Sequence, residues 1–130
     1  MASIFSRIIA GEIPCHKIAE NDLFIAFLDI EPLVEGHVLV VPKQEVDKVY
    51  EAEEKYLANM MVFAQPIATA VEKAFPCKRC GFALIGLEVP HAHLHVVPIN
   101  TANDLNFTRE KLIVTNEQLE AAKAKILAHM

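Results

Sequence analysis

The 130-residue sequence has no tryptophan, only four glycines and three cysteines, and fewer basic than acidic residues. Three cysteines are too few, and odd in number, for a disulfide scaffold. With 12 Lys and Arg against 17 Asp and Glu, the formal net charge is -5, which argues against a protein that binds nucleic acid through a basic surface. The scarcity of glycine and a charged fraction of 22% exclude a low-complexity chain.

The sequence also has no run of about 18 apolar residues, so we expect no membrane-spanning helix. The segment Met1–Arg7 lacks a charged start, an apolar core and a cleavage site, so we expect no secretory signal. Together with cysteines that we expect to be reduced, these absences predict a cytoplasmic protein. The length suits one domain over residues 1–130.

Apolar residues recur at three- and four-residue steps between Glu53 and Phe75, which predicts a long amphipathic helix. Pro66 lies within this segment and removes a backbone donor, so we expect a kink or a break there. Ser3 is placed to cap the first of two further helices. These two helices are expected at residues 4–10 and 116–130.

Five other segments are apolar and bounded by turn-forming residues, which predicts strands. They are residues 15–19, 23–28, 37–41, 81–87 and 93–99. Because the strands that are adjacent in sequence are joined by short turns, we expect an α+β domain. It would contain a mostly antiparallel five-stranded sheet, one long helix and a C-terminal helix.

Three of the six histidines lie at alternate positions, in His91-Ala92-His93-Leu94-His95. On a strand, alternate side chains face the same side, so the three imidazoles share one face and Ala92 and Leu94 the other. A solvated strand face that is rich in histidine is the simplest interpretation. Metal binding by His91 and His93 is the second, because same-side neighbours lie about 6.5–7 Å apart. All three histidines cannot easily share one ion.

The third interpretation is phosphoryl or nucleotidyl transfer. A neutral imidazole is nucleophilic at neutral pH, so one histidine can attack phosphorus while its neighbours stabilise charge and move protons. Residues 91–97 resemble the His-x-His-x-His-x-x signature of the histidine triad (HIT) family. Residues 4–14, 26–32 and 36–43 are similar to further family segments, in the same order and at similar spacing.

This resemblance is closest to bacterial members of the branch that hydrolyses nucleoside phosphoramidates. It implies a HIT fold, a homodimer, no cofactor, and cleavage of a purine nucleotide or nucleotide conjugate at the α-phosphate. The reaction would pass through a covalent nucleotidyl-histidine. Two alternatives stay open: a nucleotide-binding or scaffold protein with weak turnover, and a metal-dependent hydrolase using His91 and His93.

The resemblance also implies roles for individual residues. His93 matches the nucleophile, His95 the neighbour that contacts the phosphate oxygens, and His91 the residue whose backbone carbonyl fixes the tautomer of His93. His37 matches a fourth histidine that supports the triad, and Asp29 the carboxylate that accepts from the ribose hydroxyls. The apolar slot for the base is matched by Phe5, Ile8, Phe27 and Ile30.

The loop before His91 departs from the family pattern. An Asn that contacts phosphate in many relatives is missing, and Leu87 replaces the Gln of a related Gly-Gln-Glu-Val-Pro form. Gly86 and Glu88 in this loop are assigned to the nucleotide site. The Glu88 carboxylate would repel a phosphate unless it points away or is protonated, which puts turnover rate and substrate preference in question.

Two further sets of residues concern metal. Some bacterial relatives bind structural zinc through Cys-x-x-Cys near the N-terminus and a His after Pro-Lys. The matching residues here are Ser3, Ser6 and Glu45, so we expect that site to be lost. Cys77 and Cys80 have the spacing of half a zinc site, but no second half follows, so an ordinary cysteine pair is expected.

Overall fold

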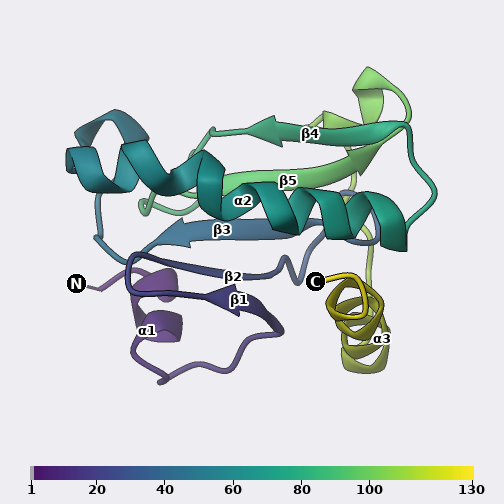
Figure 1. The fold of residues 1–130 in the computed structure, drawn as a ribbon, viewed down its shortest axis with the longest axis horizontal. Coiled ribbons are helices and arrows are strands. Elements are labelled where there is room, and N and C mark those ends of the chain that lie inside the picture. Colours follow the sequence, from purple (N-terminus) through teal and green to yellow (C-terminus); the bar gives the residue numbers. More distant parts are fainter. Residues whose placement is uncertain (1) are drawn as a thin grey trace.

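The computed structural model of the chain describes residues 2–130. Its centre is an antiparallel five-stranded sheet of order β1-β2-β3-β5-β4 (Figure 1). The strands are Lys17–Glu20 (β1), Phe24–Leu28 (β2), Val38–Pro42 (β3), Arg79–Ala83 (β4) and Leu94–Ile99 (β5). The helices are Ile4–Ile9 (α1), Glu54–Ala74 (α2) and Asn116–Leu127 (α3), with 3-10 turns at Val49–Glu51 (η1) and Ala102–Leu105 (η2). The α+β fold predicted from the sequence is confirmed.

The long helix α2 is helical at every residue from Glu54 to Ala74, so the break expected at Pro66 does not occur. Figure 1 shows α2 lying across the sheet over β3 and β5. A proline removes one hydrogen bond, but packing of the apolar face supplies most of the stability of a helix in a protein. The buried residues of that face are Met60, Ala64, Ile67, Ala70 and Val71.

The sheet carries two different faces. One face packs against α2 and α3, and it includes Leu94 and Val96. The other carries a smaller apolar cluster of Phe5, Ile25, Phe27, Leu39 and Val41, against which α1 packs. Because Leu39 is the register partner of His95, His95 lies on the α1 face. The predicted alternation therefore holds at β5, with the apolar residues toward α2.

The predicted strand ends differ from the observed ones next to the histidines. β4 ends at Ala83 instead of residue 87, since residues 84–90 form a loop. β5 begins at Leu94, so His91 and His93 precede the strand instead of lying within it. His91 is consequently not one of three side chains in a row, and its ring is fully buried.

A turn that requires glycine at position 36 places His37 directly before β3. Gly36 has φ +92°, and a Cβ at this position would lie 2.6 Å from the ring of Phe75. Both the positive φ and the close approach require glycine here. Over residues 2–130, no helix is both long and apolar enough to cross a membrane.

Candidate active site

A cavity of about 290 Å³ opens on the α1 face of the sheet. Most of the predicted site residues lie in its walls. These are Phe5, Asp29, His37, Gly86, Glu88, His93 and His95. Three of the four residues predicted for the base slot do not line it. Phe27 packs behind Phe5 with ring centroids 5.6 Å apart, Ile8 is partly buried in the same cluster, and Ile30 is 62% exposed.

The protonation state of His93 follows from its backbone partner. Its Nδ1 lies 2.7 Å from the carbonyl oxygen of His91. A carbonyl only accepts, so Nδ1 carries the hydrogen and Nε2 keeps its lone pair. Burial lowers the pKa of His93 below its usual value of 6.5, so the ring is neutral at pH 7. The site thus holds a nucleophilic imidazole nitrogen.

His37 and His95 form a relay that ends in a hydrogen-bond donor. The backbone N–H of Leu33 donates to His37 Nδ1 at 3.0 Å, so His37 carries its hydrogen on Nε2. That nitrogen lies 2.9 Å from His95 Nδ1 and donates to it. The hydrogen of His95 must then be on its own Nε2. Burial lowers the pKa of both residues to about 3, so both rings are neutral and the relay presents an N–H suited to a phosphate oxygen.

His91 lies behind the cavity and is held from both ends of its ring. Its Nε2 donates to the carbonyl of Pro42 at 2.8 Å, and its Nδ1 accepts from Ser3 Oγ at 2.7 Å. Glu45 accepts from the Ser3 backbone N–H at 2.7 Å and from Ser6 Oγ at 2.6 Å. Ser3, Ser6 and Glu45, the residues that the sequence matched to the zinc ligands of some bacterial relatives, therefore form a hydrogen-bonded clamp. The pKa of Glu45 is lowered to about 2, chiefly by the bond from Ser6.

Asp29 follows β2 directly and lies at the edge of the relay. Its Oδ1 accepts from the Glu31 backbone N–H at 2.9 Å, while Oδ2 lies 3.7 Å from His37 Nε2. Burial raises the pKa of Asp29 to about 6, although its side chain keeps 20% of its exposure. At neutral pH it therefore presents a carboxylate oxygen at the cavity wall.

Sequence reasoning missed the contribution of the irregular segment that follows η2. The ring of Phe107 packs edge-on against His95, with centroids 4.5 Å apart. Lys111 Nζ donates to both carboxylate oxygens of Glu88, at 2.8 and 3.1 Å. Glu88 is therefore paired, and among the described residues that line the cavity Lys111 is the one Lys or Arg. A lone lysine in a segment without periodicity gave no signal in the sequence.

The alternative of a metal shared by His91 and His93 meets an obstacle at His91. Both of its ring nitrogens are engaged, Nε2 by the Pro42 carbonyl and Nδ1 by Ser3 Oγ, whereas His93 has its Nε2 free. Within residues 2–130, one group brings three candidate ligand atoms within 4.8 Å of one another: Asp29, His37 and His95. His37 could ligate there only by giving up the hydrogen that the Leu33 contact places on its Nε2.

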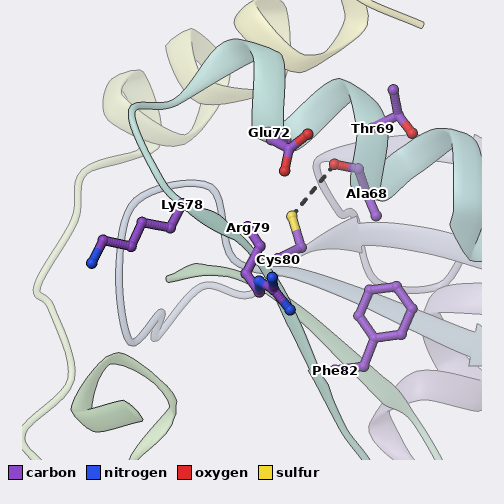
Figure 2. Close-up of a pocket in the computed structure, with 7 residues that line it drawn as sticks. All are labelled: Ala68, Thr69, Glu72, Lys78, Arg79, Cys80 and Phe82. Atoms are coloured by element: carbon purple, nitrogen blue, oxygen red, sulfur yellow. Dashed lines mark hydrogen bonds between the residues drawn. The ribbon is translucent and has the colours of Figure 1, made fainter. Parts of the chain in front are cut away.

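Of the two cysteines near β4, Cys80 lines a different cavity. Figure 2 shows Cys80 pointing toward α2, where its Sγ donates to the carbonyl of Ala68 at 3.4 Å. Burial raises the pKa of Cys80 to about 12, so it remains a thiol. In the part of the chain that the structure describes, neither Cys77 nor Cys80 belongs to a cluster of three ligating side chains. This cavity, of about 400 Å³, has no histidine in its walls.

Known proteins resemble the chain over most of its length. The family model for the HIT domain matches residues 10–102. The adenosine 5'-monophosphoramidase hnt1 of Schizosaccharomyces pombe is 33% identical over 99 residues, which cover 75% of this chain and 74% of that protein. A Hit-like protein from Bartonella henselae has a TM-score of 0.85 and 32% identity, covering 98% of this chain and 96% of its own. A zinc-bound histidine triad family protein from Mycobacterium smegmatis has a TM-score of 0.80 and 28% identity, covering 99% and 93%.

Proposed function

The chain belongs to the histidine triad (HIT) family. From this premise we propose that it hydrolyses purine nucleoside phosphoramidates or related nucleotide conjugates at the α-phosphate. One observation carries the proposal: His93 is neutral and donates its Nδ1 hydrogen to His91, which leaves Nε2 free to attack. The monophosphoramidase activity named for the Schizosaccharomyces pombe relative supports the substrate class.

In the first step, His93 Nε2 attacks the α-phosphorus. A nitrogen–phosphorus bond forms, the bond to the leaving amine breaks, and the amine takes up one proton. The His95 N–H, held by His37, donates to a phosphate oxygen on which negative charge develops. Such a donor contributes about 3 kcal/mol to lowering the barrier.

In the second step, water attacks the same phosphorus and the bond to His93 breaks. The nucleoside monophosphate leaves, His93 regains its lone pair, and one proton is released, which balances the proton consumed by the amine. Neither step calls for a metal or a cofactor, because the buried imidazoles supply both the nucleophile and the donor.

The nucleoside half is assigned to the side of the cavity that Asp29 and Phe5 share. Asp29 accepts from the ribose hydroxyls, and Phe5 contacts the base with Phe27 packed behind it. Ile8 and Ile30, which the resemblance also assigns to the base slot, do not line the cavity, whereas Gly86 and Glu88 do. The wall loop also carries Leu87, which is 90% exposed.

We also propose a cytoplasmic homodimer with one domain per chain. β4 is an edge strand of the sheet, so one side of its backbone is available to pair with a second copy of the chain. Exposed apolar residues surround that edge: Phe82, Leu84, Met61 and Val62. Sedimentation equilibrium tests this directly, since a dimer has twice the 14.5 kDa of the chain.

The experiment that tests the activity compares the wild type with His93→Ala on adenosine phosphoramidate. We expect a loss of about a thousandfold or more in kcat and, for the wild type alone, a nucleotidyl adduct that mass spectrometry locates on His93. His129→Ala, at an exposed histidine, is the matched control.

If wild type and His93→Ala hydrolyse adenosine phosphoramidate at equal, slow rates, the proposed activity is wrong. The alternative of a nucleotide-binding protein is then favoured. The missing amide donor in the loop before His91 is the observation that favours this alternative. An activity that disappears on chelation and returns with a metal would instead favour the metal-dependent hydrolase.

A further inference from the structure

An irregular segment, residues 106–115, joins η2 to α3 and forms part of the wall of the candidate active site. We call this segment the strap. Three of its side chains line the cavity: Phe107, Thr108 and Lys111. Phe107 lies outside residues 10–102, which the family model matches, and neither step of the proposed reaction uses it. The strap therefore brings to the site an aromatic side chain that the family match does not cover.

The strap is held against other parts of the chain on both sides of the cavity. Where it begins, the carbonyl of Asn103 in η2 accepts from the Asn106 backbone N–H at 3.2 Å and from the Arg109 guanidinium at 2.8 Å. Farther along, the Leu112 backbone N–H donates to the carbonyl of Pro32 at 2.9 Å. Because the backbone is bound to η2 before and after residue 107, the side chain at this position is carried by a fixed segment.

The ring of Phe107 packs against both histidines of the relay. Its centroid lies 4.5 Å from that of His95 and 6.3 Å from that of His37, and both contacts are edge-on. Two further ring contacts of His95 are to His93 at 4.8 Å and to His37 at 5.1 Å, so Phe107 is the apolar one of these three neighbours. His95 lines the cavity and yet is only 7% exposed. The Phe107 ring is thus part of the cover that keeps the relay buried.

The orientation of the His95 ring decides whether the relay can act on a phosphate. Its Nδ1 accepts from His37, so the plane of the ring sets the direction of the Nε2–H. Hydrogen bonds weaken steeply when the donor is misaligned, and water at an uncovered ring competes for both nitrogens. Packing against an aromatic ring opposes both effects, because the contact favours one ring orientation and excludes water.

We propose that Phe107 is a positioning residue for the hydrolysis: it covers His95, keeps water from the hydrogen bond between His37 and His95, and holds the His95 Nε2–H toward the phosphate oxygen. This role rests on the proposed function, which places the α-phosphate beside His95. Phe107 acts through His95 and needs no contact of its own with the reacting atoms.

The kinetic test compares Phe107→Ala and Phe107→Leu with the wild type on adenosine phosphoramidate. Phe107→Ala should lower kcat about tenfold, because it weakens a donor to charge that develops in the transition state. KM should change less than about threefold, since the ground state depends less on that donor. Phe107→Leu should recover most of kcat, because leucine restores an apolar cover.

Ile113→Ala is the matched control for these kinetics, since Ile113 belongs to the same strap and is 98% exposed. It should leave both kinetic constants unchanged. An unchanged kcat in Phe107→Ala, whatever its KM, overturns the positioning role. If KM alone rises, Phe107 is a substrate contact instead.

The ionisation of His95 gives a second measurement, which needs no turnover. Burial lowers the pKa of His95 to about 3, and this is the largest of the effects that act on it. The titratable and charged groups around the relay are His37, His93 and Lys111, which lower this pKa further, together with Asp29 near His37 and Glu88 paired with Lys111. Since the substitution at Phe107 leaves all of these groups in place, a change in the pKa of His95 reports the access of water.

An NMR titration of the His95 ring makes this measurement. In Phe107→Ala, water reaches the ring and the pKa of His95 should rise toward its usual 6.5. In the wild type, in Phe107→Leu and in Ile113→Ala it should stay low. If His95 titrates at the same pH in the wild type and in Phe107→Ala, the Phe107 ring does not keep water from the relay and the proposal is wrong.

Ligand binding separates failure of this role from failure of the proposed activity. AMP carries a phosphate and adenosine does not, so the ratio of their dissociation constants, measured by calorimetry, reports the contact to phosphate. Phe107→Ala should weaken the binding of AMP about threefold and leave that of adenosine unchanged. This result supports the positioning role even if the wild type hydrolyses no phosphoramidate, whereas an unchanged ratio overturns it.

Discussion

The floor and the rim of the candidate active site are stabilised in different ways. The floor consists of the four buried histidines His37, His91, His93 and His95. Backbone groups decide where the hydrogen lies on three of them, and His37 decides it for His95. The rim is the pair of Glu88 and Lys111, in which two charged side chains meet with the carboxylate 76% exposed. Protonation of the floor is fixed before a substrate binds, whereas the rim pair exchanges with solvent and salt.

The difference follows from what a lost partner costs in each place. A buried donor or acceptor that loses its partner costs about 1–3 kcal/mol, because no water replaces the partner. An exposed ion pair contributes about 0–1 kcal/mol, since water solvates either charge alone. Substitutions in the floor should therefore be severe and insensitive to salt, and those in the rim mild and sensitive to it.

The sharpest way to break the floor is His37→Phe. This change removes the donor to His95 and leaves the Leu33 N–H and His95 Nδ1 buried without partners. We expect the free energy of unfolding to fall by about 3 kcal/mol and kcat to fall about a hundredfold. Urea unfolding and steady-state kinetics measure the two effects.

His129→Phe, at an exposed histidine, is the control for the volume and polarity change. A fall in stability with kcat unchanged would show that His37 is structural and does not act through His95. His37→Gln should recover part of both losses, because an amide supplies both a donor and an acceptor.

Lowering the pH tests the whole floor at once. For His37 and His95, the folded pKa of about 3 lies below the usual 6.5, so their stabilisation is complete above pH 6.5 and is lost as the unfolded chain takes up protons below it. At pH 5 this amounts to about 2 kcal/mol for each residue. Asp29 opposes the loss, because its pKa is raised to about 6 and the folded state binds its proton first, which returns about 1.4 kcal/mol.

Because a part of each effect is already present at pH 6.5, the free energy of unfolding should fall by about 2 kcal/mol between pH 6.5 and pH 5. Urea unfolding at several pH values measures it, with His37→Phe expected to show a smaller slope. A free energy that is constant or rises toward pH 5 would mean that the two rings are not held neutral. In the same range kcat should persist below pH 6.5, since the pKa of His93 is lowered.

The sequence predicted the floor better than the rim, for physical reasons. The alternation around Leu94 and the matching motif segments are local patterns, and they identified both the sheet and the histidines. Which ring nitrogen carries the hydrogen depends on the Leu33 N–H for His37 and on the Pro42 carbonyl for His91. Pro42 lies 49 residues from His91 in the sequence. No local pattern encodes such contacts, and the same holds for the unbroken helix at Pro66, where tertiary packing decides.

The rim was beyond prediction because it joins two irregular segments. Glu88 and Lys111 are 23 residues apart, and neither lies in a helix or strand. The sequence therefore raised the concern that Glu88 repels phosphate, but it held no signal for the cation that pairs with it. Where side chains from loops meet, periodicity and motifs carry little information.

Asp29 lies between the floor and the rim, and Asp29→Asn tests its assignment to the ribose. The amide cannot accept from two ribose hydroxyls as a carboxylate does, so we expect KM for an adenosine phosphoramidate to rise about tenfold with little change in kcat. A dideoxyribose analogue, tested on the same two proteins, should show almost no difference between them. An equal rise in KM for both nucleosides would contradict the assignment of Asp29 to the ribose.

The smallest effects are expected at the rim. Glu88→Gln should change the free energy of unfolding by less than about 1 kcal/mol, because the pair is exposed. Lys111→Met should raise KM a few-fold, since it removes the cation while Asp29 and Glu88 remain in the cavity wall. Both effects should vanish at roughly 1 M salt, where the screening length falls to about 3 Å. If the Lys111→Met effect on KM persists at that salt concentration, Lys111 is part of the preorganised floor and the division between the two regions fails.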